Sequence, residues 1–199
     1  MKLGFVVSAV VCFSAIAACT PMQTRLQELD VPPQRIVQKG YSLMPPNENG
    51  WLIARRNQYQ LDLVKRGANE DESIAIQAAP VRLPEFTSTE EFVRLVKEGQ
   101  AKDTNPLRFA IKGHDVAAYS QKGNCVKSHL LTEDNAAVRR SKRSGVLILE
   151  ALTLTCVHPK NKTVGINVTY SHRYDPKNED PAFIGKATAV LDSMEFGEL

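Results

Sequence analysis

The chain has 199 residues, of which 43% are hydrophobic and 24% are charged, and its formal net charge is +3. This is an ordinary globular composition, and the length suits one domain better than two. A strongly basic surface is typical of nucleic-acid-binding proteins, so the small net charge argues against a nucleic-acid partner.

The first 18 residues have the pattern of a secretory signal. Met1 and Lys2 form a short positive start, and only apolar and small residues follow from Leu3 to Ala18. The stretch ends in Ile16-Ala17-Ala18-Cys19, which resembles the lipobox of bacterial lipoprotein signal peptides. The resemblance implies cleavage before Cys19 and lipidation of its thiol with diacylglycerol and palmitate-type chains.

Two other interpretations remain open, an uncleaved anchor helix and an ordinary signal peptide with a coincidental cysteine. A membrane-spanning helix needs about 20 apolar residues, and this run is shorter and is followed by Thr20-Pro21 without a positive flank. Residues 14–18 can supply the cleavage site of an ordinary signal.

Lipidation implies a place in the bacterial cell envelope, anchored to the membrane and facing the periplasm. Thr20, rather than an aspartate, follows Cys19, which resembles lipoproteins sorted to the outer membrane rather than the inner one. We therefore expect a signal peptide over residues 1–18, a lipidated N-terminus and flexible tether over 19–35, and a single α+β domain over 36–199.

The first half of the domain reads as strands followed by a helix. Short strands are expected at residues 36–37, 41–44, 51–56, 58–65 and 74–78, where alternating apolar residues indicate an antiparallel sheet with one solvated face. Ser88-Thr89-Glu90-Glu91 is a capping box, so we predict a helix that begins there and ends near Gly99.

The second half repeats this order. Strands are expected over 107–119 and 125–131, and the most apolar run, Val146–Cys156, predicts a central strand covered on both faces. Residues 164–170 are its expected neighbour. Asp180-Pro181 predicts the start of a second amphipathic helix, with proline at its first position. The fold class is therefore α+β, an antiparallel sheet with two main helices packed on it.

This layout resembles the PsbP-like fold. The resemblance covers about Tyr41 to Phe196 and depends on Gly50-Trp51, the Ser-x-x-Glu helix start and the closing segment Val190–Phe196. The fold is shared by the PsbP proteins of photosystem II, Mog-type Ran-binding proteins and DcrB-type bacterial envelope lipoproteins. It implies a binding or assembly module rather than an enzyme. No binding residue carries over, and a disulfide is a departure from the family.

Four cysteines are present, of which Cys12 leaves with the signal and Cys19 is the expected lipid site. The remaining pair, Cys125 and Cys156, is expected to form a disulfide in an oxidising compartment. A redox pair is an alternative, although such pairs usually have the Cys-x-x-Cys spacing. A metal site made of two cysteines and two histidines is a further alternative, because His129 and His158 lie close to these cysteines in sequence.

Motifs that would indicate an enzyme are missing from the sequence: there is no Gly-x-Ser-x-Gly elbow, no His-Glu-x-x-His and no phosphate-binding glycine loop. We expect no catalytic residue, no metal and no cofactor. The alternative is a metal-dependent or hydrolytic envelope enzyme that uses Cys125, His129, Cys156 and His158. His172 continues an apolar strand face and is expected in the core or at its edge.

Four cations lie close together at Arg139, Arg140, Lys142 and Arg143. One interpretation is an anion-binding patch for anionic lipid headgroups or an acidic envelope protein. The other is a solvated loop between strands. The expected partners are therefore the membrane, through the lipid anchor, and envelope proteins or anionic headgroups.

Overall fold

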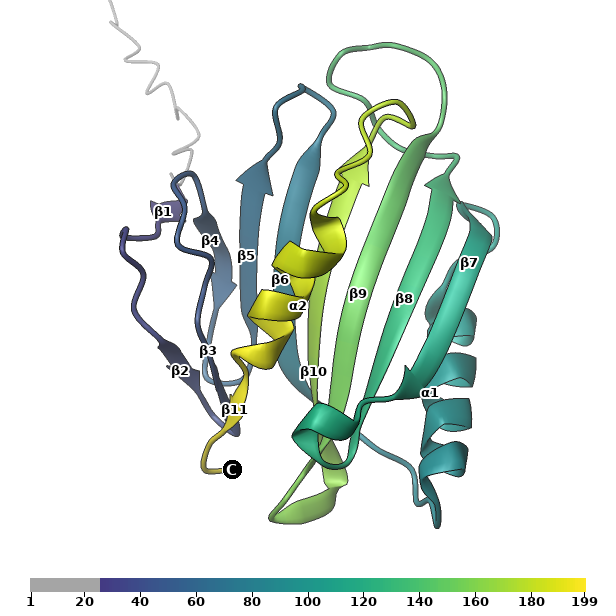
Figure 1. The fold of residues 1–199 in the computed structure, drawn as a ribbon. Coiled ribbons are helices and arrows are strands. Elements are labelled where there is room, and N and C mark those ends of the chain that lie inside the picture. Colours follow the sequence, from purple (N-terminus) through teal and green to yellow (C-terminus); the bar gives the residue numbers. More distant parts are fainter. Residues whose placement is uncertain (1–25) are drawn as a thin grey trace, which may run out of the picture.

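The computed structural model describes residues 26–199, so the signal sequence and Cys19 lie outside the described residues. This part of the chain is an α+β domain dominated by antiparallel sheet, as expected (Figure 1). No helix within it is long and apolar enough to cross a membrane. Its elements are β1 (Gln27–Glu28), β2 (Ile36–Gln38), β3 (Tyr41–Leu43), β4 (Leu52–Arg56), β5 (Leu61–Arg66), β6 (Ser73–Arg82), α1 (Thr89–Asp103), β7 (Phe109–Ala118), the 3-10 turn η1 (Ser120–Lys122), β8 (Cys125–Asp134), β9 (Leu147–His158), β10 (Asn161–Tyr174), α2 (Phe183–Asp192) and β11 (Glu195–Phe196).

The strands form two sheets. The large sheet has the order β1-β4-β5-β6-β10-β9-β8-β7 with antiparallel neighbours, and the small one has the order β11-β3-β2. Strand β9 lies between β10 and β8, and its last seven residues are all buried. The prediction of a central strand covered on both sides is therefore confirmed.

The pairing register shows at which of the two ends of the large sheet each connecting loop or turn lies. Arg66, Ser73, Arg173, Leu149 and Thr132 form one row across five strands. Beyond this row lies the loop end, made of residues 67–72, 104–108, 135–146 and 175–182. The opposite, turn end consists of residues 57–60, 83–88, 119–124 and 159–160.

The main core lies on the face of the large sheet that α2 and the small sheet cover (Figure 1). Trp51 is fully buried there, and its ring meets that of Tyr170 edge to face at a centroid distance of 6.2 Å. The Trp51 indole N–H donates to Glu48 at 3.0 Å, which satisfies its only polar group.

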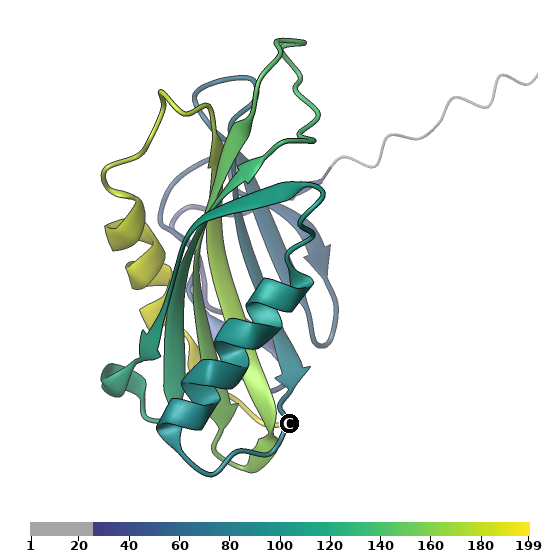
Figure 2. The ribbon, with the colours of Figure 1, turned by 90° about the vertical axis from the view of Figure 1, so that its right-hand side faces the viewer.

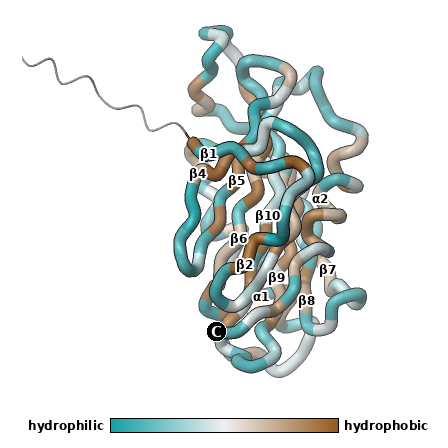
Figure 3. Tube along the Cα trace, turned by 90° about the vertical axis from the view of Figure 1, so that its left-hand side faces the viewer, coloured by the Kyte–Doolittle hydropathy of each residue, from teal (hydrophilic) through white to brown (hydrophobic). Residues whose placement is uncertain are grey.

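The opposite face is covered by α1 only over β7 and β8 (Figure 2). Elsewhere this face carries small polar residues: the Thr153 and Thr169 hydroxyls lie 2.9 Å apart, and the Asn167 amide donates to the Thr155 hydroxyl at 3.0 Å. The alternation expected for the first strands is seen in β5 and β6, where buried residues alternate with half-buried or exposed ones. On β9, Thr153 and Thr155 are buried. Figure 3 shows hydrophobic residues concentrated on the strands and mainly hydrophilic loops at the loop end.

The start of α1 is confirmed, but its predicted end is wrong. The Ser88 hydroxyl accepts from the Glu91 amide at 3.2 Å, while the Glu91 carboxylate accepts from the amide of Thr87 at 2.8 Å rather than from that of Ser88. The helix continues through Gly99 to Asp103. Tertiary contact explains the continuation, because the Gln100 amide donates to the Ser128 hydroxyl on β8 at 2.7 Å.

The second helix begins later than expected. The carboxylate of Asp180 accepts from the amide of Ala182 at 2.9 Å, and its carbonyl accepts from the amide of Phe183. The capping role of Asp180 is therefore present, but it closes a turn ahead of the helix. Pro181 lies in that turn, before the first helical residue Phe183.

Residues 26–35 were expected to belong to the flexible tether, but they are bound to the domain. Gln27 and Glu28 pair with Ile53 and Leu52 at the edge of the large sheet, so backbone hydrogen bonds hold them without any apolar pattern. Farther along, the Arg35 guanidinium donates to the Ser193 carbonyl at 2.8 Å. This segment is attached to the domain.

Candidate functional site

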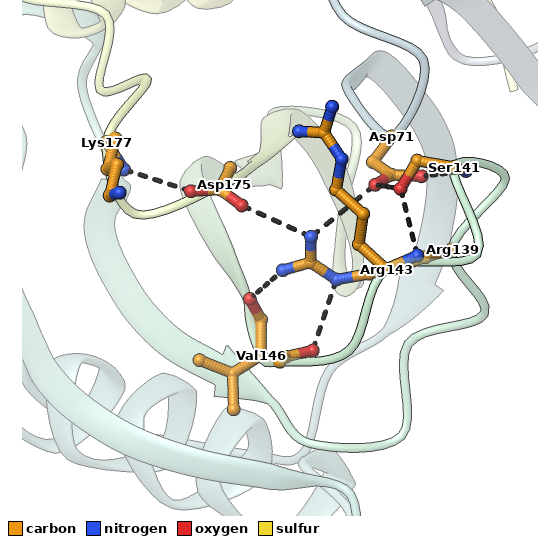
Figure 4. Close-up of polar contacts among 8 residues, drawn as sticks. Asp71, Arg139, Ser141, Arg143, Val146, Asp175 and Lys177 are labelled. Carbon is orange, nitrogen blue, oxygen red and sulfur yellow. Dashed lines mark hydrogen bonds and ion pairs between the residues drawn. The ribbon is translucent and has the colours of Figure 1, made fainter.

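The loop end carries the basic segment that the sequence singled out, and Arg139 is the hub of its contacts (Figure 4). The Arg139 guanidinium lies 3.2 Å from the Asp175 carboxylate and 3.5 Å from that of Asp71. It also donates to the carbonyls of Gly145, at 3.1 Å, and Val146. Its side chain is only 5% exposed. Arg139 therefore does not belong to a surface patch, which corrects the expectation of four free cations.

Ser141 completes the hub from the same loop. Its amide donates to one Asp71 oxygen at 2.9 Å and its hydroxyl donates to the other. These bonds, helped by Arg139, lower the pKa of the Asp71 carboxyl. The hydrogen bond from Arg139 likewise lowers the pKa of Asp175. Both carboxylates are consequently ionised at neutral pH, and the hub joins the β8–β9 loop to its two neighbouring loops.

The other three cations project from the clamped loop. Arg140, Lys142 and Arg143 are exposed, and none of them forms an ion pair with an acidic residue of the described chain. Lys142 has a φ of 58°, a left-handed conformation that places it in a tight turn. In Figure 4 the Arg143 side chain extends away from the Arg139 guanidinium. The anion-binding candidate is thus reduced to these three residues.

Two strongly exposed apolar side chains lie in loops of the same end of the sheet. Val138 is 93% exposed and Leu107 is 91% exposed, more than the other large hydrophobic residues in the described part of the chain. Their loops are neighbours, because the Asn135 amide donates to the Arg108 carbonyl at 2.9 Å. Arg108 also binds the buried Asp134 carboxylate through two nitrogens, at 2.8 and 2.7 Å. Neither apolar residue belongs to a motif that marks it as functional in the sequence.

A groove of about 820 Å³ lies at the turn end, beside the start of α1. Phe86 and Phe92 stack in its wall with ring centroids 4.6 Å apart, and Val157 and Cys125 add apolar surface. Its remaining lining residues are mostly polar: Glu85, Thr87, Ser88, Thr89, Glu91, Tyr119, Ser120, Asn124, Lys162 and Thr163, with Pro84, Ala118 and Gly123. This mixture is typical of ligand-binding grooves.

The expected disulfide between Cys125 and Cys156 is confirmed. The two residues face each other across β8 and β9 and lie in the main core. The bond therefore fastens the end of the β7–β8 hairpin to the central strand, directly beside the groove.

The structure does not bring the proposed Cys and His constellation together. Both cysteines are used by the disulfide, and His129 lies opposite Leu152, four residues along β9 from Cys156. His129 contacts the Glu150 carboxylate at 2.7 Å, whereas a ring nitrogen of His158 contacts the Gly197 carbonyl at 3.1 Å. Across residues 26–199, no group of three or more His, Cys, Asp or Glu side chains is placed to hold a metal ion.

His172 lies in the core, as expected, within a polar cluster that sequence reasoning missed. It is 2% exposed, and one ring nitrogen contacts the Glu72 carboxylate at 2.8 Å. Burial raises the pKa of Glu72, but hydrogen bonds from His172 and Asn69 outweigh burial and lower it. The Tyr174 ring stacks on His172 and its hydroxyl donates to Glu150. Glu150, the one charged residue in the apolar run Val146–Cys156, was the available signal for this cluster.

No protein-family model and no curated protein sequence matches this chain. The candidate regions are therefore defined by their geometry and chemistry alone.

Proposed function

We propose that this chain is a lipoprotein of the bacterial cell envelope, lipidated at Cys19, whose domain faces the periplasm and acts as a non-catalytic binding or assembly module. The outer membrane is the proposed location. The observation that carries the anchor is the Ile16-Ala17-Ala18-Cys19 motif at the end of a short apolar run. The disulfide supports an oxidising compartment, since such bonds persist outside the cytosol.

The binding role depends on the groove at the turn end. Its volume of about 820 Å³ falls within the usual range of roughly 300–1,000 Å³ for ligand sites. The stacked Phe86 and Phe92 rings offer a flat apolar contact, and hydroxyl and amide groups surround it. A partner with an apolar or aromatic group and a polar backbone would match this lining.

A PsbP-like domain is part of the proposal. The order of strands, helix, strands and helix supports it. The eight-stranded sheet, with its helices on opposite faces, is larger than the layout expected from the sequence.

The anchor is tested by expressing the full chain in bacteria beside a Cys19→Ser variant. Mass spectrometry of the N-terminal peptide should find an acylated Cys19 in the first protein, which should fractionate with the outer membrane. The variant should lose both properties. An unmodified Cys19, or inner-membrane fractionation of the acylated protein, would contradict the anchor or the location respectively.

The groove is tested by photo-crosslinking in intact cells. A photoreactive phenylalanine replaces Phe86 in one variant and Arg56, an exposed residue outside the groove, in the control. A product of one discrete added mass at position 86, absent at position 56, is the expected result. Identical products at both positions, or none at position 86, would argue against a binding role for the groove.

A further inference from the structure

We propose that the loop end is the membrane-facing surface of this domain, and that Arg140, Lys142, Arg143 and the apolar tip Val138 contact the anionic headgroups of the bilayer that holds the anchor. This inference rests on the proposed lipidation at Cys19. It adds an orientation and a lipid-binding surface to the proposed function.

The length and attachment of the chain support this orientation. Six residues separate Cys19 from Leu26, and the seven Cα-to-Cα steps between them reach at most about 25 Å at full extension. The 14 residues of β10, in contrast, span about 46 Å at 3.3 Å per residue. The tether is therefore shorter than the sheet, and the part of the sheet where β1 is attached must stay near the membrane.

That part lies toward the loop end. Glu28 pairs with Leu52, and the row continues through Val64 and Ala75 to Ser171. Ser171 is three residues from the last residue of β10 and ten from its first. In Figures 1 and 2 the start of β1 and the β8–β9 loop lie in the same half of the molecule.

The charges of the loop end complement an anionic surface. Its loops expose four cations, Arg140, Lys142, Arg143 and Lys177, and two carboxylates, Glu70 and Glu179. The Arg139 guanidinium neutralises only one of the two hub carboxylates, Asp71 and Asp175, so the hub keeps a net negative charge. The four exposed cations still exceed the two exposed carboxylates and this remaining charge together.

Val138 and Leu107 supply an apolar contribution. Both side chains are almost completely exposed to water, and they lie in neighbouring loops. Basic residues beside exposed apolar ones are the combination that binds the interface of an anionic bilayer, where charge attracts and apolar groups enter the headgroup region. The contacts of Arg139 hold the base of the β8–β9 loop. The exposed cations and Val138, which belong to this loop, therefore stay at the loop end.

The test uses the full acylated protein in vesicles of phosphatidylethanolamine with and without phosphatidylglycerol. A fluorophore is attached to a cysteine introduced by Val138→Cys, or by Lys160→Cys at the turn end. Labelling is specific because Cys125 and Cys156 are bonded to each other and Cys19 is acylated. Quenching by a spin-labelled headgroup should be several-fold stronger at position 138, and stronger still with phosphatidylglycerol.

Matched charge reversals test the role of the cations. Arg140→Glu with Arg143→Glu should reduce the quenching at position 138 to the level seen at position 160. Arg56→Glu with Arg82→Glu, which reverses two exposed cations beside the turn end and outside the groove, should leave it unchanged. Equal effects of the two pairs, or quenching that does not depend on phosphatidylglycerol, would overturn the recognition of anionic headgroups.

Vesicle flotation separates this inference from the proposed function. If the wild-type protein does not float with neutral vesicles, the anchor and the orientation are both contradicted. If it floats and the label at position 138 is quenched no more than the label at position 160, only the orientation is contradicted.

Discussion

The two ends of the large sheet are built by different interactions. The turn end joins its segments by apolar contact and a covalent bond, namely the Phe86–Phe92 stack and the disulfide beside the groove. The loop end joins three loops through one buried guanidinium and the carboxylates and carbonyls around it. Apolar burial depends little on pH or salt, whereas ion pairs depend on both. Substitutions at the turn end should therefore change the free energy of unfolding most, whereas the loop end should respond most to pH and salt.

The largest effect is expected from Phe92→Ala at the turn end. Phe92 is 3% exposed and fixes the start of α1 on the sheet, so its truncation should cost about 3–5 kcal/mol. The free energy of unfolding from chemical denaturation is the measurement. Phe92→Leu, which keeps most of the volume, is the control, and equal losses in the two variants would contradict the packing argument.

Removal of the disulfide should have the next largest effect. The Cys125→Ala and Cys156→Ala double variant opens a loop with a sequence separation of 31 residues. On the chain-entropy model this costs about 3–4 kcal/mol. Thermal unfolding of the variant should match that of the reduced wild type. A double variant as stable as the oxidised protein would show that the bond adds nothing to the turn end.

Arg139→Met should act locally at the loop end. It removes the hydrogen bonds to the Gly145 and Val146 carbonyls, and a bond to a charged group contributes about 1.5–3 kcal/mol. Hydrogen exchange should become faster in residues 138–146 while β9 keeps its protection. Arg140→Met, at an exposed neighbouring position, is the control. Unchanged exchange in Arg139→Met would contradict the role of the hub.

The loop end should also loosen in acid before the turn end does. The pKa values of Asp71 and Asp175 are lowered in the folded protein. Their contribution to stability is therefore fully present above the ordinary carboxyl pKa of about 4 and is lost as the pH falls through the lowered values. Fluorescence anisotropy of a label at Val138→Cys should stay constant from neutral pH to about pH 5 and fall below about pH 4. A fall near neutral pH would contradict this assignment.

The smallest change in stability is expected from the loop-end charge reversal, Arg140→Glu with Arg143→Glu. Both side chains are exposed, and such substitutions usually change the free energy of unfolding by less than about 0.5 kcal/mol. Chemical denaturation measures this directly. A loss comparable to that of Phe92→Ala would mean that the two ends do not divide stability as described.

Local signals in the sequence were sufficient for several elements. The apolar run ending at Cys156 predicted the central strand because both of its faces must be covered, and Ser88 predicted the start of α1 because its hydroxyl satisfies a free amide. The disulfide followed from the two cysteines that remain after Cys12 and Cys19 are assigned, and it is present. Each of these inferences depends on residues close in sequence or on a count.

Only the tertiary structure decided the rest, because the deciding contacts join residues far apart in the chain. The burial of Arg139 depends on Asp71, 68 residues earlier, and the attachment of β1 depends on the free edge of β4. Helix α1 passes Gly99 because β8 offers Ser128 to Gln100. The sequence by itself determined the fold class, the anchor motif and the basic segment. The arrangement in space determined which of those cations are free and which end of the sheet carries them.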